Sequence, residues 1–455
     1  MPFSLTSARI RALAFFAPFL AFFAIGIVPA SAQPIALIRD TEIERVLRGY
    51  EDPILRVAGL DPSAVKIYIV NDPSINAFVA EGQNIFINTG LIMQLKTPNQ
   101  VIGVIAHETG HMAGGHLIRD TSAISKASIP MLIGMAVGIA AMVAGAGDAG
   151  MAAIMMGQQA AQAQFVQFSR VQEATADQMG QKFLRLTHQS GEGMLEVFSK
   201  FAQEEVGMKI DPLYMDHPAL RERIDLLQDE VDSSPYKDVK DSPAAQHEFN
   251  MIQAKLYGYL GDPDRVLQRF PPSDTSDVAR YARAMAYFRK PDLAKALDEI
   301  NSLIKEQPKN PYFWEVLGQI YVDMSQPEKG IAPYQTAVNL LPDAPLLRIS
   351  LAAAQLATER PALAKPALDN LIVALQQEND NTFGWYEAAQ AYSQLGNQPM
   401  ADLSTAERYY SAGVMPMAAQ FAHRAEAQLT KGTPDWERAN DILIAVPQAE
   451  KAQQQ

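Results

Sequence analysis

The chain has 455 residues, enough for two or three domains, and its 48% hydrophobic content and mean hydropathy of −0.08 are typical of globular protein. A formal net charge of −13 argues against nucleic acid, and against anionic lipid, as electrostatic partners. Cysteine is absent, which excludes disulfides, thiol nucleophiles and cysteine metal ligands.

The N-terminus has the three-part layout of a secretory signal peptide. Two arginines precede an apolar run at 12–28, and Ala30-Ser31-Ala32 provides a small-residue cleavage site. An uncleaved membrane anchor is the alternative, because the run is nearly long enough to span a bilayer. Pro29 and the small residues favour cleavage after residue 32. We therefore expect a mature protein in a bacterial periplasm.

The segment after the signal peptide predicts one helix and a small sheet. Residues 33 to about 63 have apolar positions at helical spacing. Three segments with strand character follow, at 65–70, 76–80 and 84–88. A protein substrate in extended conformation could add as a strand to an edge formed by Asn76, Phe78 and Ala80. A sheet that only supports the next helix fits the same pattern.

The segment 107–111 spells H-E-x-x-H. On a helix His107 and His111 leave the same face and can hold one metal ion. Glu108 lies one step round the helix, where it can hold a water at the metal and accept its proton. Zinc is the expected ion because it lowers the pKa of water by roughly eight units. A surface helix with two solvated histidines is the alternative, but the apolar run at 101–106 favours burial.

A catalytic zinc site needs a third protein ligand. The segment 165–186 has helical character, and Glu173 and Asp177 lie four residues apart on one face of it. We expect Glu173 to be the third ligand and Asp177 to hydrogen-bond a ligand imidazole, fixing its tautomer. A solvated acidic stripe is the alternative, although these acids interrupt a segment rich in Ala, Phe and Met.

An apolar stretch separates the two halves of this predicted site. Residues 129–157 are rich in Ala, Gly, Met and Ile, and we expect a helical hairpin that is buried or in peripheral contact with a membrane. A single membrane span is disfavoured because it would separate the two halves of the site. Two further histidines need roles. His116 falls off the ligand face of a continuous helix, so we expect a supporting or structural role, and His217 can cap the helix that follows it.

From about residue 244 the sequence consists of helical pairs with a period near 34 residues, as in tetratricopeptide repeats. Units near 284 and 385 match less completely, and 347–375 matches poorly. Such stacks form a concave surface that binds protein segments; a helical cap without a partner is the alternative. The clearest unit carries the expected packing residues Trp314, Leu317, Gly318, Tyr321, Tyr334, Ala337 and Pro342.

These patterns predict an α+β zincin-like metalloprotease domain, mostly helical with a small sheet, followed by an all-α tetratricopeptide solenoid. The expected boundaries are a signal peptide at 1–32, the protease domain at 33–236, a linker at 237–243, the repeats at 244–447 and a polar tail at 448–455.

With a signal peptide, H-E-T-G-H, E-A-T-A-D, H-P-x-x-x-x-R-I and repeats in that order, the chain resembles the BepA-like periplasmic metalloproteases. These belong to a wider group that includes HtpX and Oma, and the resemblance covers essentially the whole mature chain. It implies one zinc ion per chain, bound by His107, His111 and Glu173. It also implies that Glu108 is the general base and that Asp177 is the acidic partner.

The resemblance has three further implications. His217 falls where a histidine of the family can take a fourth zinc position and hold the enzyme shut, and Arg223 falls near the site. The implied activity is zinc-dependent cleavage of envelope or misfolded outer-membrane proteins. The repeats would recruit substrates or outer-membrane assembly proteins. The alternative function is a chaperone-like protein-binding factor whose protease site is latent.

Overall fold

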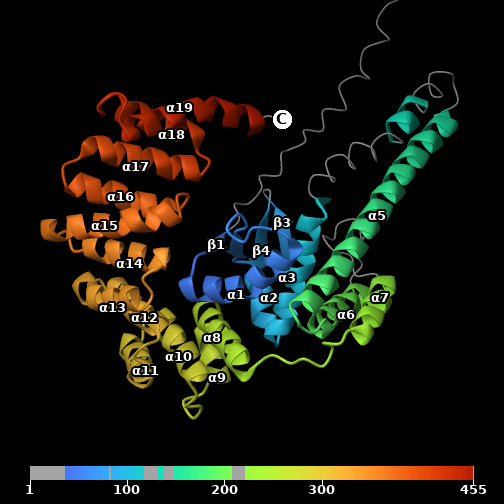
Figure 1. The fold of residues 1–455 in the computed structure, drawn as a ribbon, viewed down its shortest axis with the longest axis horizontal. Coiled ribbons are helices and arrows are strands. Elements are labelled where there is room, and N and C mark those ends of the chain that lie inside the picture. Colours follow the sequence, from blue (N-terminus) through green and yellow to red (C-terminus); the bar gives the residue numbers. More distant parts are fainter. Residues whose placement is uncertain (1–35, 81–82, 117–130, 138–146, 208–220, 454–455) are drawn as a thin grey trace, which may run out of the picture. The chain divides into compact units, whose positions relative to one another are not determined.

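The computed structural model describes residues 36–80, 83–116, 131–137, 147–207 and 221–453 (Figure 1). The predicted signal peptide and His217 lie outside these ranges. Among the described residues, we find no helix with the length and apolar character needed to cross a bilayer.

The small sheet contains four strands in the order β1-β2-β4-β3. β2 and β4 are parallel, with Tyr68 opposite Phe86, whereas β1 and β3 pair antiparallel with their neighbours. The Phe86 ring stacks between the rings of Tyr68 and Phe78 on the two neighbouring strands, with centroid distances of 5.1 Å and 5.0 Å respectively. The bounds are β1 (Leu37–Ile38), β2 (Ile67–Val70), β3 (Ala77–Ala80) and β4 (Asn84–Asn88).

Strand β1 corrects the expectation of continuous helix from residue 33. Helix α1 (Thr41–Ala58) begins only after Asp40, whose carboxylate accepts a hydrogen bond from the Ile43 N–H at 3.0 Å. The residues before this cap are free to pair with β2. A two-residue strand has no periodicity that a sequence pattern could reveal.

Helix α3 (Pro98–Ala113) carries the H-E-x-x-H motif and is buried along nearly its whole length. It follows the short α2 (Thr89–Gln94), and a capping box between Thr97 and Gln100 starts it. α1, α5 and α6 surround it. Burial on several sides explains why its sequence is apolar without a polar stripe.

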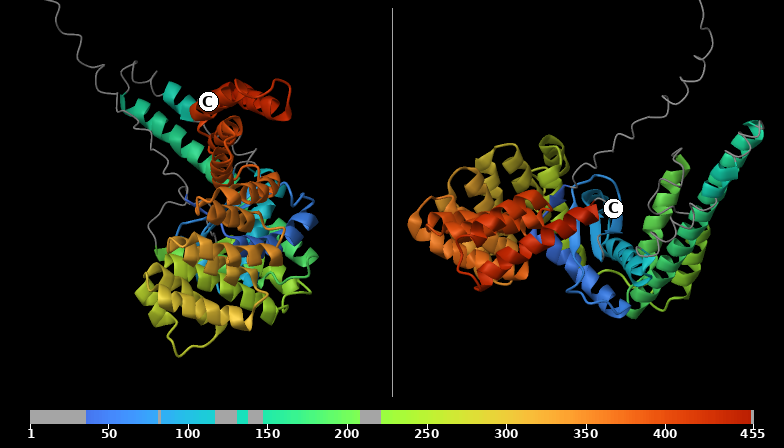
Figure 2. Two further views of the ribbon diagram at one scale, coloured as in Figure 1. Left: turned by 90° about the vertical axis from the view of Figure 1, so that its left-hand side faces the viewer. Right: turned by 90° about the horizontal axis from the view of Figure 1, so that it is seen from above.

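The predicted helix at 165–186 is the second half of a longer one. α5 (Gly147–Leu186) has 40 residues and precedes α6 (Glu192–Gly207) and α7 (Arg221–Ser233). A further helical segment at 131–137 packs against it, since a Cβ at Gly134 would lie 2.7 Å from the Ala153 carbonyl oxygen. The first half of α5 projects away from the sheet in both Figures 1 and 2.

The repeat region consists of helical pairs that stack in chain order (Figures 1 and 2). One hydrogen bond recurs in three consecutive units. The Trp314 and Trp385 indoles each donate to the carbonyl six residues earlier, at 2.9 and 2.7 Å, and the Arg348 guanidinium donates to Pro342 in the same way. The poorly matching unit at 347–375 is therefore a regular pair in which arginine replaces tryptophan.

The helices of this region are α8 (Pro243–Leu260), α9 (Pro263–Arg269), α10 (Asp277–Arg289), α11 (Leu293–Glu306), α12 (Pro311–Asp323), α13 (Pro327–Leu340), α14 (Pro345–Leu356), α15 (Pro361–Gln377), α16 (Thr382–Gln394), α17 (Gln398–Ser411), α18 (Met415–Glu426) and α19 (Pro434–Gln453).

A buried lysine joins the start of α1 to the repeats. Lys255 of α8 is 5% exposed, and its Nζ lies 2.6 Å from Asp40 and 3.4 Å from both Glu42 and Glu315. Tyr281 also donates to Glu42 at 2.8 Å. Burial raises the pKa of Glu315 to about 7, although Lys255 opposes that shift. The cluster therefore holds more carboxylates than cations and depends on this one ammonium group.

We expect Lys255→Met to lower the free energy of unfolding by about 3–5 kcal/mol at pH 8, because it leaves buried carboxylates without their cation. The pKa of Glu315 is raised on folding, so its contribution to stability is full below about pH 4.5 and is lost as pH rises through about 7. The substitution should therefore cost less at pH 5. Urea unfolding at both pH values measures this difference.

Lys365→Met is the matched control, because Lys365 forms an exposed ion pair with Asp369 one helical turn away. Exposed ion pairs of this kind contribute about 0–1 kcal/mol to the free energy of unfolding. Equal losses in the two variants at pH 8 would show that the buried cluster does not hold the repeats to α1.

Candidate metal centre

The two histidines of the motif face one another on α3. Their Nε2 atoms are 3.1 Å apart, and the rings meet edge to face with centroids 4.7 Å apart. His107 is 1% exposed, whereas the side chain of His111 is 12% exposed. Spacing by four residues on a helix accounts for this placement. The sequence expectation that both imidazoles share a face agrees with the geometry.

Glu173 of α5 completes a triangle of donor atoms. Its carboxylate oxygens lie 3.5 Å from His107 Nε2 and 3.4 Å from His111 Nε2. Two ligands in a tetrahedral zinc site, each about 2.0–2.1 Å from the metal, are separated by about 3.3 Å. The distance between the two Nε2 atoms and the distance from each Nε2 to one oxygen of the Glu173 carboxylate are close to this value, and the donors are the nitrogen and oxygen types that zinc accepts. The residues therefore fit a zinc ion.

The backbones of α3 and α5 cross in direct contact, and this brings Glu173 within reach of the two imidazoles. A Cβ on Gly110 would lie 2.6 Å from the Ala176 carbonyl oxygen, closer than any side chain permits. On the other side of the crossing, a Cβ on Gly180 would lie 3.2 Å from the Ala106 carbonyl carbon. Glycine at the fourth position of the motif therefore lets α5 approach α3 closely enough for its carboxylate to reach the imidazoles.

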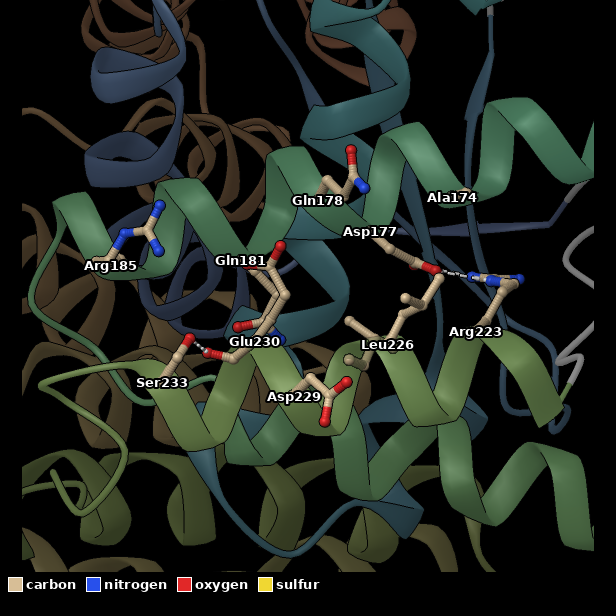
Figure 3. A pocket seen from close by; sticks show the side chains of 11 residues that line it. Ala174, Asp177, Gln178, Gln181, Arg185, Arg223, Leu226, Asp229, Glu230 and Ser233 are labelled. Carbon is tan, nitrogen blue, oxygen red and sulfur yellow. Dashed lines mark hydrogen bonds and ion pairs between the residues drawn. The ribbon is translucent and has the colours of Figure 1, made fainter.

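Asp177 and Arg223 contact the residues of this triangle and each other, and Figure 3 shows the contact between the two. Asp177 Oδ1 lies 3.0 Å from His107 Nδ1, so it can hold the tautomer that presents Nε2 to a metal. Arg223 of α7 donates to both oxygens of Asp177 at 2.7 and 2.9 Å, and its Nη1 is 2.8 Å from Glu173. Its guanidinium also lies over the Phe198 ring at 5.3 Å. One arginine thus orients both carboxylates.

The electrostatics of the site favour positive charge. Burial alone would lower the pKa of His107, but Asp177 and Glu173 outweigh it and raise this pKa to about 9. Burial opposes ionisation of Asp177, yet hydrogen bonds from His107 and Arg223 lower its pKa. The lowered pKa keeps Asp177 ionised at 4% exposure, and its negative charge beside the imidazoles favours a bound cation.

The other residues predicted for the site lie at different places in the structure. Glu108 lies beside His107 and is 2% exposed. Asn76, Phe78 and Ala80 lie on or next to β3, the strand at the end of the sheet order. A cavity of about 410 Å³ between α5 and α7 is lined by Asp177 and Arg223 among other residues (Figure 3). The predicted fourth ligand, His217, lies outside the described residues.

His116 belongs to the site, although it falls off the ligand face of a continuous helix. It is 3% exposed, and its Nδ1 lies 3.0 Å from His111 Nδ1. α3 ends at Ala113 and Gly115 takes the left-handed conformation at φ +63°, which brings the His116 ring against His111. The adjacent Gly114-Gly115 pair is the sequence signal for this turn.

Comparisons with known proteins agree with the geometry. Residues 39–231 match the model of "Peptidase family M48". The beta-barrel assembly-enhancing protease of Yersinia pestis is 22% identical over 377 residues, which covers 80% of this chain and 75% of that protein. Metalloprotease LoiP of Escherichia coli (strain K12) is 32% identical over 177 residues, covering 39% of this chain and 66% of that protein.

Among solved structures, the crystal structure of YrrB, described as a TPR protein with an unusual peptide-binding site, aligns with a TM-score of 0.32 and 18% identity. The alignment covers 38% of this chain and 89% of YrrB. The family match spans strands β2, β4 and β3, the H-E-x-x-H helix and the helix that carries Glu173. Residues 39–231 therefore form a metallopeptidase domain of family M48 whose His-His-Glu cluster is consistent with zinc, and the chain is related to the beta-barrel assembly-enhancing proteases.

Proposed function

We propose that the chain is a periplasmic zinc endopeptidase that cleaves envelope or misfolded outer-membrane proteins in extended conformation. The observation that carries the proposal is the buried triangle of His107, His111 and Glu173, supported by Asp177 and Arg223. A structural ion pair network would not need two imidazole nitrogens directed at each other.

Each residue has a role in peptide hydrolysis. His107, His111 and Glu173 would hold zinc, which as a Lewis acid makes water a nucleophile at neutral pH. Glu108 accepts the proton of the attacking water and returns it to the leaving amine. Asp177 and Arg223 keep the ligands in their productive protonation states and orientations.

The substrate would add to the free edge of β3. The Asn88 N–H donates to the Asn76 carbonyl at 3.0 Å, so alternation along an antiparallel pair directs the backbone groups of Ala77 and Val79 away from β4. No strand pairs with that edge among the described residues. β3 also contacts α3, the helix that carries His107 and His111, which supports binding of a peptide at this edge.

The repeats would recruit the substrate or outer-membrane assembly proteins. A cavity of about 480 Å³ lies between the start of α1 and the repeats, lined by charged groups such as Glu315 and Asp323 and by aromatic rings such as Phe383. Mixed polar and apolar walls suit a protein segment. The name of the relative in Yersinia pestis, which refers to beta-barrel assembly, supports substrates of the same class.

The arm formed by residues 131–137 and 151–156 would contact the surface of a lipid bilayer. Large apolar side chains are exposed on both of its helices, including Leu132 at 59% and Met156 at 69%. Between Lys126 and Arg170 the only charged residue is Asp148, in a chain with 20% charged residues. An uncharged apolar arm on an acidic protein fits hydrophobic contact with lipid rather than attraction to anionic headgroups.

Glu108→Gln should lower cleavage of an unfolded outer-membrane protein by at least about 10²-fold while zinc content stays unchanged, because the residue transfers protons and is not a ligand. Gel-based proteolysis and metal analysis measure both quantities. Glu222→Gln, at an exposed position of α7, is the control and should behave like wild type. Undiminished cleavage by Glu108→Gln would exclude the proposed mechanism. Absence of cleavage in wild type would favour the chaperone-like alternative.

Arg223→Met should weaken zinc binding by about 10–100-fold, because it removes the group that orients Glu173 and Asp177. It should also lower the free energy of unfolding by about 3–5 kcal/mol through the unpaired carboxylates. Arg221→Met, two residues earlier and exposed, serves as the control. Competition with a chromophoric chelator measures the affinity. Equal zinc affinity in the two variants contradicts the role given to Arg223.

The mature protein should float with phosphatidylcholine vesicles in a density gradient. Burying a Leu or Met side chain contributes about 1.5–3 kcal/mol, so Leu132→Asp with Met156→Asp should lower the partition coefficient by at least about tenfold. Val239→Asp with Leu395→Asp changes two exposed apolar residues elsewhere and should have no effect. Absence of flotation in wild type, or equal flotation of both variants, would exclude this contact.

A further inference from the structure

Both histidines of the H-E-x-x-H motif have a partner at the ring nitrogen that faces away from the triangle. His107 Nδ1 lies 3.0 Å from the Asp177 carboxylate. His111 Nδ1 also has a partner at 3.0 Å, but this partner is the imidazole of His116. The His111 and His116 rings meet edge to face, with centroids 4.9 Å apart and an interplanar angle of 81°.

The turn after α3 is built to place this ring. The chain leaves the helix at Gly114, and the positive φ of Gly115 turns it back toward His111. A Cβ on Gly114 would lie 2.5 Å from His116 Nε2, so only glycine leaves room for the ring at that position. Both glycines are thus explained by one requirement, namely that an imidazole lies against His111.

We propose that His116 is a positioning residue that fixes the tautomer and orientation of His111; this inference rests on the proposed zinc site. When His111 Nε2 faces the metal, its Nδ1 carries the proton and donates it to His116 Nδ1. His116 is therefore the neutral tautomer protonated on Nε2. It performs for His111 the task that Asp177 performs for His107.

The charges at the site explain why an imidazole rather than a second carboxylate stands here. Among the described residues, and with His116 neutral, the charges of a zinc ion and Arg223 would balance those that Glu108, Glu173 and Asp177 carry when ionised. A carboxylate at position 116 would add a further negative charge at 3% exposure to a site that already holds three carboxyl groups. A neutral acceptor orients His111 without disturbing this balance.

The test compares two replacements of equal size. In His116→Asn the amide oxygen lies near the position of Nδ1 and can accept the His111 proton, whereas His116→Leu has the same shape without an acceptor. We expect His116→Leu to lower zinc affinity by about 10–100-fold and His116→Asn to retain it within a few-fold. Chelator competition on the full mature chain measures both, and the d–d spectrum of the cobalt-substituted protein reports the ligand geometry.

A measurement on the wild-type protein avoids dependence on variants that fold poorly. With ¹⁵N-labelled histidine in the zinc-loaded chain, a hydrogen bond between the two Nδ1 atoms should give a scalar coupling between those nitrogens. Equal zinc affinity of the Leu and Asn variants, or absence of the coupling, would overturn the positioning role. A wild-type chain that binds no zinc would instead overturn the proposed function, so the two failures are distinguishable.

Discussion

The close crossing of α3 and α5 is the constraint on which the metal centre depends. Gly110 meets the Ala176 backbone where any side chain would collide, and this contact sets the distance between the two helix axes. At that distance Glu173 reaches both imidazoles, and Asp177, one turn later, reaches the outer nitrogen of His107. A wider crossing would leave two histidines on one helix and two carboxylates on another, with no common point for a metal.

Buried charge connects distant parts of the chain at two places. At the metal centre, Arg223 joins α7 to the carboxylates of α5. At the junction with the repeats, Lys255 of α8 joins Asp40 at the start of α1 to Glu315 of α12. A buried charge is tolerated only beside its counter-charge, so each cluster requires elements far apart in sequence to pack in one arrangement.

The repeats show how a structural contact can survive the loss of its usual residue. Arg348 makes the hydrogen bond that Trp314 and Trp385 make in the neighbouring units, to the carbonyl six residues earlier. The contact needs an N–H donor on a long side chain, and a guanidinium provides one as well as an indole. A sequence pattern that searches for tryptophan misses this unit, whereas the helical pair forms normally.

The sequence by itself determined the contacts that arise within one helix or strand, because a fixed period places their residues. The shared face of His107 and His111, the spacing of Glu173 and Asp177, and three of the four strands follow from periods of 3.6 and 2. Only the tertiary structure decided which elements meet. β1 pairs with β2, Arg223 binds the carboxylates of Glu173 and Asp177, and the His116 ring lies against His111. These contacts depend on a helix cap, a helix crossing and a left-handed glycine, and their geometry appears only when the elements pack together.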